Sequence, residues 1–312
     1  MENVNKRFKA FAPATVANLG CGFDVLGLAL SSLGDHVSVY WNRKINNEIV
    51  SIKNAEGIST VFSENCCGVV IEAMQKALGV HQNVDVEIEK GYRSGSGLGS
   101  SAASCAAAAM AYNAINGNPF SKKELVEFAA LGEQRSSGVV HVDNVAPAIY
   151  GGITLMVESS PLKVINLNYP QDLYVVVVFP DIVINTQESR ALLRDQVSLS
   201  EASRQSAYLG GFLTGLQIDN VELMQQSMVD LLVEPSRKSS IPFFDDLKQK
   251  AMSQGAIGFS ISGSGPSVFA LVKGKADAEK VQQELVSFCQ LKDINHISFI
   301  DQINAQGAYM VN

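Results

Sequence analysis

The chain has 312 residues, enough for two domains with sizeable hydrophobic cores. Hydrophobic residues make up 46% and charged residues 18% of the sequence, a composition that excludes a mainly disordered chain. The formal net charge of −7 argues against a general nucleic-acid-binding protein, which needs a basic surface.

Cysteine spacing and the length of apolar runs indicate where in the cell the protein is found. The five cysteines form no C-x-x-C pair and have no histidine at metal-ligand spacing, which favours reduced, buried thiols. No apolar stretch follows the basic N-terminal segment, so we expect no signal peptide. The longest strongly apolar run, from Tyr174 to Phe179, is far too short to span a membrane. We therefore expect a soluble, cytoplasmic protein without membrane or nucleic-acid partners.

The first half of the chain mixes strand and helix patterns. Segment 48–53 reads as a strand, and apolar residues alternate with acids over 83–89, as in a half-buried strand. The alanine-rich stretch 100–115 predicts a helix, because alanine has the highest helix propensity. Ser121 and Glu124 have the spacing of a capping box, so we expect a helix from there to about residue 131. A further strand is expected over 151–158.

The second half begins near residue 168, where NYPQD predicts a turn before a buried strand over 173–179. Helices are expected over 187–195, 200–216, 221–231 and 243–254. Two strands, IGFSIS and SVFALV, follow with a glycine turn between them, and then a helix over 276–288. This alternation predicts two α+β domains, covering residues 1–167 and 168–312.

A glycine-rich loop, GSGLG at 95–99, lies between an expected strand and the alanine-rich helix. Its glycines let the backbone approach a ligand, and the unpaired N–H groups of the helix favour an anion such as phosphate. Ser100 and Ser101 add hydroxyl groups. A Walker A loop is excluded because no lysine lies between Lys90 and Lys122, and a dinucleotide fingerprint fails because Ser100 replaces its last glycine. A flexible turn before an ordinary helix remains the alternative.

Three segments together carry a resemblance that spans nearly the whole chain. They are PATVANLGCGFDVLGLAL at 13–30, EKGYRSGSGLGSSAAS at 89–104 and GFSISGSGPSVFAL at 258–271. In this order they resemble the three motifs of the GHMP kinases. The resemblance implies a two-domain α+β fold, with a ribosomal-protein-S5-like N-terminal domain and a ferredoxin-like C-terminal domain. It also implies that ATP binds to the glycine loop together with Mg²⁺, and that the third motif closes a turn against this loop.

The segments HVDNVAPAIYGG at 141–152 and VEPSRKSSIP at 233–242 are most similar to the homoserine kinases within this superfamily. This similarity implies that the substrate is L-homoserine and that the reaction is a step of threonine biosynthesis. Homoserine carries an ammonium, a carboxylate and the hydroxyl to be phosphorylated. The matching positions assign Asp24 to the ammonium and Arg190 and Arg237 to the carboxylate, which a planar guanidinium can bind with two bonds. The remaining substrate-binding assignments are Asn18, His141 and Asn144.

The same resemblance assigns the catalytic and nucleotide-binding residues. Glu133 and Ser101 match the Mg²⁺ ligands, a set that suits Mg²⁺ once phosphate oxygens and water complete it. Asn144 cannot accept a proton at neutral pH, so we expect catalysis without a protein base unless the adjacent Asp143 serves as one. The catalytic residues are thus Ser101, Glu133, Asn144 and Arg190. The ATP-binding residues are Asn65, Lys90, Gly95, Ser96, Gly97, Leu98, Gly99, Ser100 and Ser101.

Two other functions remain open, and the sequence departs from the family pattern at two places. The protein could phosphorylate another small alcohol, such as mevalonate or shikimate, which lacks the ammonium that Asp24 would bind. It could also be a nucleotide-binding regulator that has lost its activity. Arg93 and Ser94 lie just before the glycine loop, where relatives have a proline and an aliphatic residue, and Cys21 stands where a small residue or proline is common. A homodimer is expected from the family alone.

Overall fold

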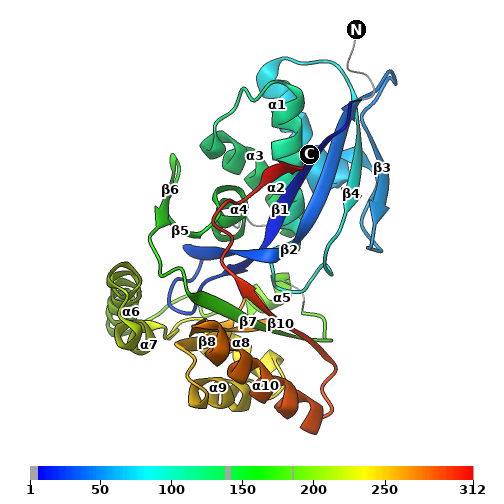
Figure 1. The fold of residues 1–312 in the computed structure, drawn as a ribbon. Helices are drawn as coiled ribbons and strands as arrows, with labels where there is room; N and C mark the ends of the chain where they lie inside the picture. Colours follow the sequence, from blue (N-terminus) through cyan, green and yellow to red (C-terminus); the bar gives the residue numbers. More distant parts are fainter. Residues whose placement is uncertain (1–5, 138–141, 185, 312) are drawn as a thin grey trace.

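The computed structural model describes residues 6–137, 142–184 and 186–311. Its strands form two sheets, one of seven strands and one of four. Figure 1 shows helices α1 to α4 gathered on one face of the larger sheet, and helices α9 and α10 on the outer face of the smaller one. This is the two-domain mixture of helices and strands that the sequence predicts.

The larger sheet has the order β11-β1-β2-β4-β3, and a second branch in which β5 pairs with both β2 and β6. Its pairs are antiparallel except β3 with β4, which is parallel. The strands are β1 (Phe8–Ala17), β2 (Leu26–Trp41), β3 (Glu48–Lys53), β4 (Val84–Glu89), β5 (Ile153–Ser159), β6 (Leu162–Leu167) and β11 (Tyr309–Val311).

Helix α2 lies at the centre of the helical layer. It packs on β1 and β2 of the sheet and on α1, α3 and α4 around it. Its alanines explain this position, because only small side chains allow a helix to be approached closely on several sides. The helices of this layer are α1 (Cys66–Leu78), α2 (Ser100–Ile115), α3 (Lys122–Ser137) and α4 (Val142–Tyr150), preceded by the short 3₁₀ helix η1 (Phe62–Glu64).

The smaller sheet is antiparallel, with the strand order β10-β7-β9-β8. Its strands are β7 (Leu173–Pro180), β8 (Gly258–Ile261), β9 (Val268–Lys273) and β10 (His296–Gln302). The helices that accompany it are α5 (Thr186–Ala191), α6 (Leu199–Ile218), α7 (Val221–Ser227), α8 (Glu234–Arg237), α9 (Phe244–Ser253) and α10 (Lys275–Leu291), with the 3₁₀ helix η2 (Lys238–Ser240) after α8.

Strand β7 is buried on both faces, which explains its uninterrupted apolar sequence. Val176 and Val178 pack in a cluster with residues of α9 and α10. Val175 and Val177 point to the other face, into a cluster that also contains residues of β1, β2, α6 and α7. Because this second cluster draws on strands of both sheets, it joins the two halves of the molecule through a shared core.

Most of the expected elements are confirmed, and their ends differ where local signals were weak. Strand β3 and helix α2 have the predicted bounds. The capping box is present, with the Ser121 N–H donating to Glu124 Oε2 over 2.8 Å, but α3 runs on to Ser137 rather than ending near residue 131. Helices α5 and α7 are shorter than expected. In the described part of the chain, no helix is long and apolar enough to cross a membrane.

The two halves are not separate along the chain. Strand β11 returns from the smaller sheet to pair with β1, with Lys9 opposite Val311. The division at residue 168 stays a prediction, and strand β11 lies in the larger sheet although it follows that division.

Candidate active site

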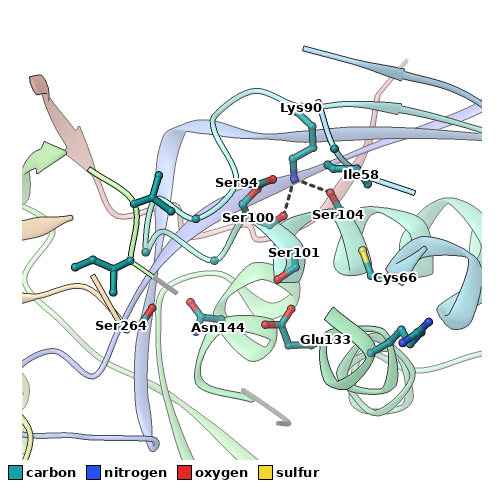
Figure 2. Close-up of a pocket in the computed structure, with 18 of the residues that line it drawn as sticks. Ile58, Cys66, Lys90, Ser94, Ser100, Ser101, Ser104, Glu133, Asn144 and Ser264 are labelled. Carbon is teal, nitrogen blue, oxygen red and sulfur yellow. Dashed lines mark hydrogen bonds between the residues drawn. The ribbon is translucent and has the colours of Figure 1, made fainter. Parts of the chain in front are cut away.

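A cleft of about 770 Å³ lies where the two halves meet. It is lined by the glycine loop and the start of α2, by α3 and α4, and by residues of α5, α8 and the third motif. Figure 2 shows Ser101, Glu133 and Asn144 near the N-terminal end of α2, with Lys90 above this end and Cys66 to the right of it. Among the predicted site residues that line the cleft are Asn18, Asp24, Asn65, Lys90, Ser101, Glu133, Asn144, Arg190 and Arg237.

The glycine loop has a backbone conformation that depends on its glycines. Gly95, Gly97 and Gly99 have φ values of 76°, 80° and 65°, in the left-handed region. A Cβ on Gly97 would lie 2.7 Å from the Gly265 carbonyl oxygen, so the third motif packs directly on the loop. The Ser262 hydroxyl donates to the Gly97 carbonyl over 2.7 Å, and the Ser267 N–H donates to the Ser96 carbonyl over 3.1 Å. The expected closure of the third motif against the loop is confirmed.

Gly99 is the N-cap of α2 and lies against two polar side chains. A Cβ there would lie 2.1 Å from Thr15 Oγ1 and 2.7 Å from Asn144 Oδ1. The Thr15 hydroxyl donates to Asn144 Oδ1 over 2.8 Å, which fixes the amide beside the start of the helix. The free N–H groups of the helix and the amide of Asn144 therefore lie at one place in the cleft.

The predicted magnesium ligands come from two different helices. Ser101 lies in the first turn of α2, and Glu133 is buried on α3 with an exposed fraction of 5%. Both line the cleft, and their hydroxyl and carboxylate oxygens are the kind of donor that Mg²⁺ prefers. Within the described ranges, no group of three or more acids, histidines and cysteines could hold a metal by itself. The donor set therefore fits a Mg²⁺ ion that also takes oxygens from a nucleotide.

Opposite charges meet at the other end of the cleft. Arg190 Nη2 lies 2.7 Å from Asp24 Oδ2, and both side chains are about one-third exposed. Asn18 holds the turn before Asp24: its Oδ1 accepts from the Asp24 N–H over 3.1 Å, and its Nδ2 donates to the Gly263 carbonyl over 3.2 Å. Asn18 and Asp24 both have positive φ, at 74° and 57°, so this turn is a strained, well-defined structure.

Arg237 is the more buried of the two arginines, with an exposed fraction of 5%. Its Nη1 donates to the Gly263 carbonyl over 2.9 Å, and burial lowers the pKa of its guanidinium. The ring of Phe23 lies 5.5 Å from the Arg237 guanidinium and 5.6 Å from that of Arg190. Phe23 therefore lies within cation–π distance of both arginines.

The predicted adenine residues have structural partners of their own. Asn65 caps α1, with its Oδ1 accepting from the Cys67 N–H over 2.9 Å and its Nδ2 donating to the Ser59 carbonyl over 2.8 Å. The Lys90 ammonium is buried and bonded to Asp35, Ser104 and the carbonyl of Ser100. Both residues line the cleft. Their contact with adenine stays a prediction.

The sequence also singled out His141, Asp143 and Arg93. His141 lies outside the described residues. Asp143, the alternative base beside Asn144, also lines the cleft and is buried. Arg93 forms an exposed ion pair with Asp181 and is not among the residues that line the cleft.

Sequence reasoning missed two groups of site residues. Thr15 and Phe23 stand inside the first motif, so their place in that motif was a usable signal. Asp35 is a single acid in a strand, and Ile58 and Ser59 lie in an irregular segment, so nothing near them in the sequence indicated a site.

Comparison with known proteins shows which family the chain belongs to. The family model of the GHMP kinases N terminal domain matches residues 65–152, and that of the GHMP kinases C terminal domain matches residues 212–291. The homoserine kinase of Chlorobium phaeobacteroides (strain BS1) is 36% identical, with 98% of this chain and all of the relative covered. That of Chloroherpeton thalassium is 37% identical, covering 90% of this chain and 91% of the relative.

A solved structure extends this similarity to three dimensions. The crystal structure of homoserine kinase from Cytophaga hutchinsonii ATCC 33406 matches with a TM-score of 0.95 and 38% identity, covering all of this chain and 99% of the other. The fold is therefore that of a GHMP kinase. The chain belongs to this superfamily, and within it to the homoserine kinase family.

Proposed function

We propose that this protein transfers the γ-phosphoryl group of ATP to the hydroxyl of L-homoserine, giving O-phospho-L-homoserine for threonine biosynthesis. Family membership supports the kinase reaction. The observation that carries the choice of substrate is the set of opposite charges formed by Asp24, Arg190 and Arg237 at one end of the cleft. A zwitterionic amino acid is the kind of small molecule that such a set recognises.

The other end of the cleft is suited to ATP. The N–H groups at the start of α2 and the glycine loop offer donors to phosphate oxygens, and the helix dipole favours negative charge there. Adenine would lie toward Asn65, which lines the same cleft. Ser101 and Glu133 would hold Mg²⁺, which when bound neutralises charge on the phosphates.

Binding of homoserine would replace an ion pair within the protein by ion pairs with the substrate. In the structure Asp24 pairs with Arg190. The substrate ammonium would form an ion pair with the Asp24 carboxylate, and the substrate carboxylate would pair with Arg190 and Arg237. A ligand with only one of these charges would leave the other protein group unpaired, which costs free energy as the site loses water. Mevalonate and shikimate, which lack an ammonium, fit this arrangement less well.

The reaction needs no protein base in this proposal. The homoserine oxygen forms a bond to the γ-phosphorus, the bond to the β,γ-bridging oxygen breaks, and ADP leaves. The hydroxyl proton passes to an oxygen of the transferred phosphoryl group. Asn144, fixed by Thr15, would orient the hydroxyl or the phosphoryl oxygens by hydrogen bonding. Asp143 is the alternative proton acceptor, since it is buried and lines the same cleft.

A substrate panel tests the proposal. ADP release is measured with ATP, Mg²⁺ and, in turn, homoserine, mevalonate and shikimate. We expect release with homoserine well above that with the other two alcohols. Release with mevalonate or shikimate alone would instead identify another GHMP kinase. ATP binding without ADP release for any alcohol would favour a nucleotide-binding regulator. The expected homodimer and cytoplasmic location stay predictions.

A further inference from the structure

A buried charged network lies beneath the glycine loop. It consists of Asp35 on β2, Lys90 directly after β4, and Ser104 in the second turn of α2. The side chain of Asp35 is fully buried and that of Lys90 is 2% exposed. Removing two charges from water is costly, and a well-packed apolar pair often replaces such a pair without loss of stability. Stability alone therefore does not explain why charged residues occupy these positions.

The network connects the two ends of the loop. At its start, the Gly91 N–H donates to Asp35 Oδ1 over 3.0 Å. At its end, Lys90 Nζ donates to the Ser100 carbonyl over 2.8 Å and to Ser104 Oγ over 2.9 Å, and Ser104 Oγ donates to Asp35 Oδ2 over 2.7 Å. Lys90 also forms an ion pair with Asp35. Figure 2 shows the Lys90 ammonium reaching Ser100 and Ser104, on the side of α2 away from Asn144.

Two neighbouring contacts make this arrangement rigid. A Cβ on Gly91 would lie 1.9 Å from the Gly34 carbonyl oxygen, so the start of the loop lies directly on β2 beside Asp35. The Tyr92 hydroxyl donates to the Leu98 carbonyl over 2.9 Å, which closes the loop internally. The loop entrance, the loop exit and the first turn of α2 are thus held by groups that lie behind the phosphate-binding face.

We propose that Asp35, Lys90 and Ser104 form a positioning network that sets the separation of the two loop ends and thereby the affinity for nucleotide phosphates. Lys90 acts here through the Ser100 carbonyl and Ser104 rather than by contact with ATP. Because the negative charge of Asp35 offsets the positive charge of Lys90, Lys90 affects phosphate binding through the position of the loop and not through its charge. The inference rests on the proposed role of the loop in ATP binding. It predicts that losing the network weakens binding in proportion to the number of phosphates.

Nucleotide binding without homoserine provides the test. Calorimetry measures the affinities of the parent chain and of the double variant Lys90→Met, Asp35→Asn for ATP, ADP, AMP and adenosine. The double variant leaves no unpaired buried charge. We expect an affinity loss of about ten- to hundredfold for ATP, because displacements near 1 Å have effects of this size, with a smaller loss for AMP and almost none for adenosine. Ser104→Ala keeps the ion pair. It should give smaller affinity losses, again largest for ATP and smallest for adenosine.

Control variants separate this role from a purely structural one. Lys44→Met removes an ion pair with Asp85 near the opposite end of β4 and should leave all four affinities unchanged. Thermal unfolding identifies variants that fold. Should the double variant not fold, Ser104→Ala alone decides the question. An equal loss for adenosine and ATP, or no loss for ATP in folded variants, would overturn the inference while the proposed function stands. Absence of ATP binding by the parent chain would overturn both.

Discussion

The two ends of the cleft are built in different ways. The phosphate end, where we propose that ATP phosphates bind, consists mainly of backbone from one continuous segment, residues 91–101, whose conformation depends on glycine and on contacts from behind. The amino-acid end, where we propose that homoserine binds, consists of side chains from distant segments, since Asp24 follows β1 while Arg190 and Arg237 come from α5 and α8. A site made of backbone from one segment can therefore be recognised as a local sequence motif. A site made of side chains from distant segments forms only when the chain folds.

The two ends also differ in exposure. Lys90 and Asp35, which support the loop, are almost completely buried, whereas the side chains of Asp24 and Arg190 are about one-third exposed. A buried, fully bonded support keeps one geometry, and an exposed ion pair exchanges partners at low cost. The phosphate end is therefore preformed, and the amino-acid end is arranged to open for its ligand. The following predictions test this difference.

The largest effect is expected at the phosphate end from Glu133→Ala. Loss of this carboxylate should lower kcat about 10²–10³-fold, the size of effect seen when one electrostatic group is removed from a catalytic site. The KM for homoserine should change little, because Glu133 lies at the opposite end. Glu127→Ala on the same helix removes only an exposed carboxylate and serves as control. A kcat within threefold of the parent value would contradict the assigned role.

A smaller effect, also at the phosphate end, is expected from Gly99→Ala. Residue 99 has positive φ, and the new Cβ would collide with Thr15 and Asn144, so we expect the free energy of unfolding to fall by about 2–3 kcal/mol. Gly95→Ala is a matched control, because Gly95 has φ of 76° but no described atom lies within 4 Å of the added carbon. Denaturant unfolding of both variants measures the difference. Equal losses would show that packing at Gly99 is loose.

At the amino-acid end, Asp24→Asn should raise the KM for homoserine about thirtyfold, equivalent to about 2 kcal/mol for a lost charged hydrogen bond. The KM for ATP should stay the same, because the phosphate end is preformed. Asp219→Asn is the control, since Asp219 also has positive φ and also forms an ion pair, with Lys273. Steady-state kinetics with each substrate varied would measure both constants. Equal increases in the two KM values would mean that the ends are not independent.

The smallest expected effect is on the alkylation of the cysteine thiols. Hydrogen bonds from Cys105 and Cys67 lower the pKa of the Cys66 thiol, whereas burial raises that of Cys21 to about 12 and that of Cys289 to about 11. The thiolate is the reactive form, so alkylation of Cys66 should reach its plateau at a lower pH than an ordinary thiol. Cys66 lines the cleft and is partly exposed, while the other four cysteines are buried.

Mass spectrometry after brief treatment with iodoacetamide at neutral pH would locate the label. We expect it on Cys66, and we expect ATP to slow the labelling because the thiol faces the nucleotide end. Cys66→Ser should remove the fast label. Faster labelling of a different cysteine, or labelling that ATP does not affect, would contradict this placement.

The sequence predicts the elements that have local signals, and the site residues that stand within motifs. The glycine loop and the alanine-rich helix could be recognised because the glycines, and then the alanines, are close together in the sequence. Arg190 is one arginine on a short helix, and only its match to a family position singled it out. Asp143 was singled out only as the neighbour of Asn144. Asp35 could not be recognised, because its position beneath the loop results from strand pairing and helix packing between distant segments.

The pairing of β11 with β1 affects how freely the two halves could be exchanged between related proteins. A chimaera joined at residue 168 would combine β1 from one parent with β11 from the other. It would also combine the two sides of the shared core, including Leu98 of the glycine loop and Val175 and Val177 of β7. Modularity in this protein is therefore limited. A functional exchange would need a second junction before β11 and compatible packing at the shared core.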